Sequence, residues 1–240
     1  MRCLLDRPTP LDSSAYFKRR RRGDLSLAEF LQPRRIAVVL ENYGRAHGEA
    51  ACRVAVASEW SKRYFAAIVK PMVTAAIMID WRVPLAPDNV GLDVKDDGTI
   101  VGLRLSSFGG PVQAISAEDR FNFLITDNLA VVVDAIANVS GLSRHVLWSN
   151  AGNVFEGTVR NCAAFLEQGT CAMDHAFEIL EKPYFSRGVP NPLRDPIVYR
   201  IFDGKSKRLR RVCCIRYLLN SLDYCATCPC SNRKISRVPG

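Results

Sequence analysis

The sequence predicts an α+β fold: a mostly helical domain with a small antiparallel sheet, followed by a C-terminal cysteine-rich segment. Three observations support this prediction. Long stretches carry apolar residues at helical spacing, two stretches alternate around turns that contain glycine, and five of the nine cysteines lie between residues 213 and 230. Because the helical stretches mostly precede the final hairpin and do not alternate with strands, a parallel doubly wound sheet is not expected.

The first half of the chain is expected to contain an arm, a core helix region and a hairpin. Residues 1–35 are expected to form an irregular, partly helical arm that includes the basic run Lys18–Arg22. From about residue 48 to 80, apolar residues such as Trp60 recur at helical spacing, which predicts one or two long core helices. Residues 91–105, GLDVKDDGTIVGLRL, alternate around an Asp-Asp-Gly turn and predict a hairpin.

The second half is expected to add three helices and a second hairpin. The helices cover about 117–140, 142–167 and 170–181, and two strands around Asp203-Gly204 lead into the cysteine-rich segment. The expected domains are a basic N-terminal arm, a helical domain and a C-terminal metal-binding segment, at residues 1–35, 36–204 and 205–240.

Composition and cysteine usage narrow the class of protein. An apolar fraction of 48% with 24% charged residues is ordinary for a globular protein and excludes a wholly disordered chain. The N-terminus shows no apolar signal core, which favours a cytoplasmic, reducing setting. The other cysteines lack the spacing of a disulfide framework: Cys3, Cys52, Cys162 and Cys171. In that setting a tight cluster of thiols points to a bound metal.

The most apolar window, Tyr64–Trp81, does not predict a membrane span. Lys70 and Pro71 interrupt it, and it falls short of the ~20 continuous apolar residues that a span needs. A buried, Pro-kinked core helix is the expected structure. Peripheral contact with a membrane or a membrane protein is left open.

The net charge of +9 is concentrated in two places. One is the run Lys18–Arg22, which is typical of a solvated segment or of a tether to acidic lipid or nucleic acid. The other is Lys205–Arg216, which holds six basic residues and no acidic one and surrounds two adjacent cysteines. This placement indicates that the charge serves the cysteine site, so no nucleic-acid partner is expected.

The cysteine pattern is Cys213-Cys214, ten residues, Cys225, two residues, Cys228, and then Cys230. The CxxC half is a general metal clamp that is equally compatible with zinc, redox dithiols and iron–sulfur clusters. Adjacent side chains on a regular strand point to opposite faces, so both thiols of the vicinal pair reach one site only if the backbone bends at 213–214. If the backbone does not bend there, one thiol binds the metal and the other packs as a small apolar side chain.

Two alternatives to an iron–sulfur site remain at this point. The first is a zinc-binding module without redox activity, whose basic segments contact nucleic acid. The second is a thiol oxidoreductase that uses Cys225 and Cys228, although the βαβ context of that chemistry is missing. No P-loop, dinucleotide-binding glycine motif or HExxH sequence is present, and three histidines stand far apart.

The cysteine pattern CC-x10-CxxC near the C-terminus resembles the iron–sulfur signature of the FhuF-type ferric siderophore reductases. The similarity extends upstream through RRVCCIRY, NPLRDPIV, the helix LWSNAG and the apolar helix with Lys-Pro around position 70. It covers most of residues 45 to 230. The chain departs from the family pattern at Cys230, which is an extra thiol, and in its arginine-rich N-terminal arm.

The resemblance implies that Cys213, Cys214, Cys225 and Cys228 hold one [2Fe-2S] cluster. It further implies that the chain is a ferric siderophore reductase. One electron would pass from the cluster to an Fe(III)-siderophore in the cytoplasm and release Fe(II) for iron assimilation. No catalytic residue beyond the cluster is implied. Residues 36–204 would form the siderophore-reductase-like domain, and residues 205–240 the cluster-binding segment.

The expected substrate is a ferric siderophore of the hydroxamate type, and the expected electron donor is a ferredoxin or a flavoprotein reductase. The protein is expected in the cytoplasm, with peripheral contact to the membrane or to a siderophore importer left open. The expected docking residues are Trp148, Asn150, Arg210, Arg211 and Arg216. The three arginines would also oppose the negative charge of the cluster. The simpler alternatives are that Trp148 anchors a core helix and that the arginines only solvate a strand.

Overall fold

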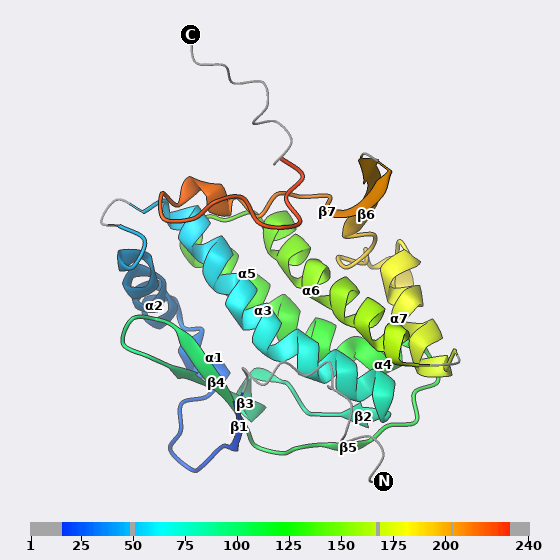
Figure 1. Ribbon diagram of the computed structural model, residues 1–240. Coiled ribbons are helices and arrows are strands. Elements are labelled where there is room, and N and C mark those ends of the chain that lie inside the picture. The colour runs from blue at the N-terminus through cyan, green and yellow to red at the C-terminus, as the bar shows by residue number, and fades with distance from the viewer. Residues whose placement is uncertain (1–15, 49–50, 167–168, 203, 231–240) are drawn as a thin grey trace.

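A computed structural model describes residues 16–48, 51–166, 169–202 and 204–230. Figure 1 shows a layer of helices with small sheets at its edges, and the C-terminal segment crossing one end of the helices. The helices and helical turns are α1 Leu27–Phe30, α2 Pro33–Arg45, α3 Arg53–Met78, η1 Pro87–Asn89, α4 Ala117–Leu124, η2 Ile125–Ala130, α5 Val131–Ser140, α6 Arg144–Phe165, α7 Cys171–Glu181, η3 Ser186–Gly188 and η4 Arg216–Leu218. The strands are β1 Tyr16–Arg19, β2 Trp81–Arg82, β3 Val90–Val94, β4 Ile100–Leu105, β5 Gly110–Pro111, β6 Ile197–Phe202 and β7 Lys205–Arg210.

The predicted fold class is confirmed: a mostly helical chain carries small sheets and ends in a cysteine-rich segment. Helix α3 is the central element and packs along α6 (Figure 1). Its side chains Trp60, Tyr64 and Phe65 are fully buried, and Trp60 stacks against Tyr64. The predicted core helix therefore exists, and it runs without a break through Pro71.

The stretch predicted as one helix at 117–140 is helical throughout but contains a wider π-helical turn, η2, between α4 and α5. By length and composition the run Ala117–Ser140 is apolar enough to cross a bilayer, with a mean hydropathy of 1.5, and 56% of its most apolar window is buried inside the protein. That burial is the pattern of a core helix. The most apolar helix is therefore this one and not the window Tyr64–Trp81 that the sequence predicts.

The first sheet has the order β1-β4-β3. Strands β3 and β4 form the predicted antiparallel hairpin around the Asp-Asp-Gly turn. Strand β1 pairs in parallel with β4, so the prediction of an irregular, partly helical arm is wrong for residues 16–19. Helix α2, which begins at Pro33 and buries Ile36 and Leu40, is not predicted from the sequence. Residues 1–15 of the predicted arm lie outside the described residues.

The second predicted hairpin is also confirmed, because β6 and β7 pair along their full length. The expected boundary between residues 204 and 205 falls in the turn of this hairpin. The division into three domains remains a prediction. Strand β7 ends at Arg210, with two residues between it and the vicinal cysteines, so the hairpin fixes where the cysteine-rich segment begins.

Candidate metal centre

The cysteine-rich segment is tied to the end of β7 and to the helix pair α3 and α6. The backbone N–H of Arg210 donates to the carbonyl of Thr227, which places the CxxC loop beside the vicinal cysteines. The Ser58 hydroxyl on α3 donates to the carbonyl of Cys214 at 2.6 Å, and the Ser149 hydroxyl on α6 donates to the carbonyl of Val212 at 3.2 Å. The vicinal cysteines and the CxxC loop are therefore held at the same end of the helical layer (Figure 1).

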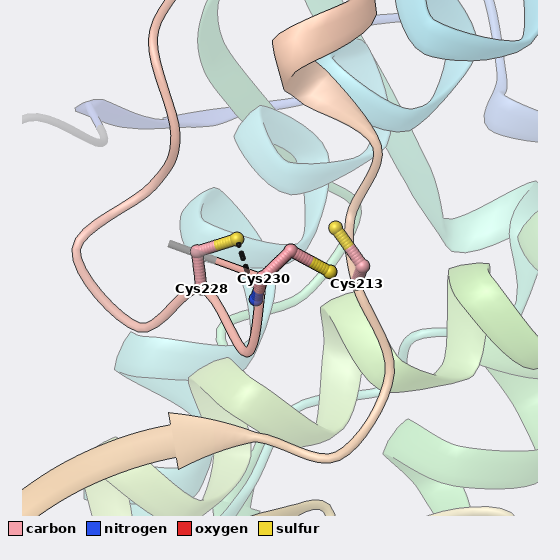
Figure 2. A group of neighbouring side chains, drawn as sticks. All are labelled: Cys213, Cys228 and Cys230. Atoms are coloured by element: carbon pink, nitrogen blue, oxygen red, sulfur yellow. Dashed lines mark hydrogen bonds between the residues drawn. The ribbon is translucent and has the colours of Figure 1, made fainter. Parts of the chain in front are cut away.

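Five thiols, here together called the thiol group, lie in two neighbouring sets that interact electrostatically: Cys213, Cys228 and Cys230 form one, and Cys214 and Cys225 form the other. The Sγ atoms of Cys213, Cys228 and Cys230 all lie within 4.8 Å of one another, and Figure 2 shows these side chains facing each other from two segments. The Sγ atoms of Cys214 and Cys225 lie 3.6 Å apart. These thiols are up to seventeen positions apart in the sequence, and the fold brings them into these two sets.

The backbone does bend at the vicinal pair, as the metal interpretation requires. Residues 213 and 214 are outside any strand, and Ile215 has a φ of 52°, a left-handed conformation that is uncommon for a β-branched residue. After this bend Cys213 lies with Cys228 and Cys230, while Cys214 lies with Cys225. The bend also lets the Ile215 N–H donate to the Cys213 sulfur at 3.4 Å, and the Cys230 N–H donates to the Cys228 sulfur at 3.3 Å. Hydrogen bonds to sulfur of this kind tune iron–sulfur potentials.

The pKa values of the thiols are shifted in different directions. The hydrogen bond with Cys225 lowers the pKa of Cys214 to about 5, and the positive charges of Lys62 and Arg210 act in the same direction. The same hydrogen bond, together with burial, raises the pKa of Cys225. Burial raises the pKa of Cys213 to about 12. A metal that binds all of these sulfurs as thiolates must therefore displace protons from the group.

Arg210 is a buried cation beside the thiols. Its side chain is 1% exposed and donates to the carbonyl of Ser149 and, at 2.7 Å, to Oδ1 of Asn150. Within the described residues, no carboxylate lies within ion-pair distance of Arg210, and its Nε has no hydrogen-bond acceptor. A buried charge normally has a partner. A group of thiolates around a metal would supply the missing negative charge.

The other expected docking residues have different surroundings. Asn150 is fully buried and donates to Ser58 and Ser61, so it positions α3 and the segment and does not face solvent. Trp148 is half-buried on α6. Arg211 is exposed and forms an ion pair with Asp195, while Arg216 is half-buried. Arg216, like Arg210, has a buried Nε without an acceptor in the described part of the chain.

The residues fit a soft metal centre. Thiolate ligands select zinc, copper(I) or iron–sulfur clusters, and the donor set here consists of cysteine sulfurs alone. Two unpaired guanidinium Nε atoms and two backbone N–H groups directed at sulfur suit a centre with net negative charge. The fold and this site define a mostly helical protein with a group of cysteine thiols, suited to a soft metal, at one end of its helices.

The chain belongs to a known family. Residues 58–204 match the model of the family described as Ferric iron reductase FhuF-like transporter. The chain is also similar to the Ferric siderophore reductase of Escherichia coli (strain K12), with 26% identity over 178 residues. That alignment covers 71% of this chain and 64% of the relative. The family match ends before Cys213, so the cysteine geometry is an independent observation.

The fold is also similar to that of a known enzyme. The ATP-bound aerobactin synthetase IucA from Klebsiella pneumoniae superposes with a TM-score of 0.51 at 15% identity, covering 67% of this chain and 34% of that chain. At this identity the similarity concerns the fold alone.

Sequence reasoning missed the residues that hold the segment in place. Ser58 and Ser61 on α3 join Asn150 in a buried polar network that ends at the carbonyl of Cys214. Asn153 on α6 accepts from Arg208 at 2.9 Å and from the Thr227 hydroxyl at 3.4 Å. The sequence did contain one signal for them: Ser58 and Ser61 lie on the apolar face of a long predicted helix, and a polar side chain at a core position needs a hydrogen-bond partner.

Replacing Ser58 with alanine is expected to loosen the metal centre. The change removes the donor to the buried carbonyl of Cys214 and should lower the free energy of unfolding by about 1–2 kcal/mol. Bound metal should be lost about tenfold faster to a chelator, as for other residues that support metal ligands. The matched control is Ser61→Ala, on the same helix and in the same network. It should cost similar stability and leave the rate of metal loss unchanged. Equal rates in the two variants would contradict the assigned role of Ser58.

Proposed function

We propose that this chain is a ferric siderophore reductase in which Cys213, Cys214, Cys225 and Cys228 hold one [2Fe-2S] cluster. The observation that carries the proposal is the grouping of Cys213 with Cys228 and of Cys214 with Cys225, near the buried Arg210, which has no carboxylate partner in the described residues. Family membership and the name of the Escherichia coli relative support the activity. Because this chain spans only 64% of that relative, the activity itself is part of the proposal.

When bound, the cluster would supply one electron to the ferric ion of the siderophore. Siderophores are hard oxygen chelators that bind Fe(III) far more tightly than Fe(II), so reduction weakens the complex and favours release of Fe(II). This chemistry needs no general acid, base or nucleophile. It needs an electron-accepting substrate that can approach the thiol group, and Cys213, Cys225 and Cys230 are only partly buried.

The surface around the thiol group offers apolar and basic contacts for such a substrate. Tyr217 is 41% exposed and stacks on Tyr224, with ring centroids 5.0 Å apart. Trp148, Arg211 and Arg216 remain the proposed docking residues at the surface, whereas the burial of Asn150 and Arg210 restricts them to supporting roles. A hydroxamate siderophore suits a surface of this mixed character.

The proposed setting is cytoplasmic, with a ferredoxin or a flavoprotein reductase as electron donor and with peripheral contact to the membrane or to a siderophore importer. Unpaired thiols are stable in a reducing compartment, and no disulfide occurs among the described cysteines. The second candidate, a zinc module without redox activity, uses the same sulfurs. A zinc ion with four thiolates and the oxidised cluster both carry a net charge of about −2, so Arg210 does not favour one over the other; only the reduced cluster, at about −3, is more negative.

A single-turnover experiment tests the proposal. The protein is reduced anaerobically with dithionite, freed of excess reductant and mixed with a ferric hydroxamate siderophore, and Fe(II) is trapped by a chromogenic chelator. About one Fe(II) per reduced chain is expected, together with reoxidation of the protein. The zinc-loaded protein serves as control and should release none. A reduced, coloured protein that yields no Fe(II) would refute the reductase activity while leaving the cluster intact.

Electrostatic attraction gives a further prediction. Reduction of an anionic ferric siderophore should slow by about tenfold between low and high salt, because the basic surface attracts the chelate only when charges are poorly screened. Arg216→Gln should weaken this salt dependence. The control is Lys18→Gln on β1, a 62% exposed charge at the other end of the protein (Figure 1), which should leave it unchanged. An identical salt response in both variants would show that Arg216 takes no part in docking.

A further inference from the structure

Cys230 lies inside the thiol group although four cysteines suffice for the proposed cluster. Its Sγ is within 4.8 Å of the Sγ atoms of both Cys213 and Cys228. Figure 2 shows its side chain turned toward Cys213, from the same loop that carries Cys228. The side chain is half-buried, so Cys230 is part of the site and not an exposed neighbour.

The five sulfurs fall into two sets. Cys214 and Cys225 form a pair with 3.6 Å between their Sγ atoms, and Cys213, Cys228 and Cys230 form a group of three. Each iron of a four-cysteine [2Fe-2S] cluster takes two protein thiolates. The pair therefore matches the needs of one iron, and the group of three contains one thiol more than the other iron requires.

We propose that Cys228 and Cys230 are interchangeable ligands of the same iron, which they bind together with Cys213. This inference rests on the proposed function, because it takes the cluster as the bound group. Cys228 is the resident ligand: it is 2% exposed, and its sulfur accepts the N–H of Cys230 at 3.3 Å. Cys230 is the reserve, and it replaces Cys228 when that thiol is lost.

The positions of the two residues make the exchange local. They are separated only by Pro229, so moving from one sulfur to the other leaves Cys213 and the strand β7 in place. Among the described residues, no third sulfur is grouped with the Cys214–Cys225 pair as Cys230 is grouped with Cys213 and Cys228. Loss of Cys225 should therefore not be compensated, which makes Cys225 the matched control on the same loop.

Four alanine variants test this inference, since alanine, unlike serine, offers no oxygen ligand: Cys228→Ala, Cys230→Ala, the double variant Cys228→Ala/Cys230→Ala, and Cys225→Ala. Each full-length protein is reconstituted anaerobically with ferrous iron and sulfide beside the wild type. The measurements are iron and sulfide per chain and the electron paramagnetic resonance spectrum of the dithionite-reduced protein. Circular dichroism checks that each variant is folded.

Both single variants at 228 and 230 should keep most of their iron and sulfide, while the double variant and Cys225→Ala should hold at least about tenfold less. The spectrum of Cys230→Ala should match that of the wild type, and that of Cys228→Ala should be shifted because the ligand has changed. If Cys228→Ala is as empty as the double variant, Cys230 cannot replace Cys228 and the inference is wrong. A wild-type protein that takes up no cluster would overturn the proposed function as well, so the two failures are distinguishable.

Discussion

Replacing Cys214 with alanine should yield a folded protein that holds no cluster and reduces ferric siderophore at least about a hundredfold more slowly. Cys214 is the buried partner of Cys225, and its loss would leave Cys225 as the single protein thiolate at one iron. Cys228 and Cys230 are grouped with Cys213 and do not belong to the Cys214–Cys225 pair. The measurements are iron and sulfide content, the visible absorption spectrum and the rate of Fe(II) release.

Cys171→Ala is the control for this variant. Cys171 begins helix α7, is exposed and takes no part in the thiol group. The control should keep the spectrum and activity of the wild type. The fold of Cys214→Ala should survive, because the Ser58 hydroxyl bonds the backbone carbonyl of residue 214 and not its side chain. Full iron and sulfide content in Cys214→Ala would remove this cysteine from the ligand set.

Arg210→Gln should lower the midpoint potential of the cluster by tens of millivolts, up to about 90 mV. The reduced cluster carries one more negative charge than the oxidised cluster, so removing a nearby positive charge destabilises the reduced form more. At an effective dielectric constant of ~20, a charge ~8 Å away contributes ~2 kcal/mol per unit of added charge. For a one-electron couple that energy corresponds to roughly 90 mV. The burial of Arg210 limits screening by salt.

Two variants separate charge from structure in this measurement. Arg210→Lys keeps the positive charge and should recover most of the potential, although it loses the paired contacts to Ser149 and Asn150. Arg211→Gln removes an adjacent charge that is exposed and already neutralised by Asp195, and it should shift the potential by no more than about 10 mV. Equal shifts in Arg210→Gln and Arg211→Gln would mean that Arg210 is not the counter-ion of the cluster.

Local sequence patterns predicted most of the fold. Apolar spacing located α3, α6 and α7, and the glycine turns located both hairpins. Strand β1 could not be predicted, because its pairing with β4 joins residues more than eighty positions apart and its sequence, YFKR, runs into a block of arginines. The π-helical turn η2 likewise depends on tertiary packing around the buried Asn128, which bonds the Tyr64 hydroxyl.

The candidate site was predictable in its chemistry and only partly in its geometry. The cysteine spacing identified the thiols and the need for a bend, and the structure has that bend at residues 213–215. Spacing did not distinguish Arg210 from Arg211, although one is buried without a carboxylate partner in the described residues and the other is paired at the surface. Adjacent residues at the end of a strand face opposite sides, so their environments differ in ways that composition cannot show.

The metal content of the protein purified anaerobically tests the central claim most directly. Iron, acid-labile sulfide and zinc are determined per chain, and the visible spectrum is recorded before and after dithionite. The expected result is a red-brown protein with about two irons and two sulfides per chain and with visible bands that bleach on reduction. A colourless protein with one zinc per chain and no sulfide would contradict the claim and establish the thiol group as a zinc site.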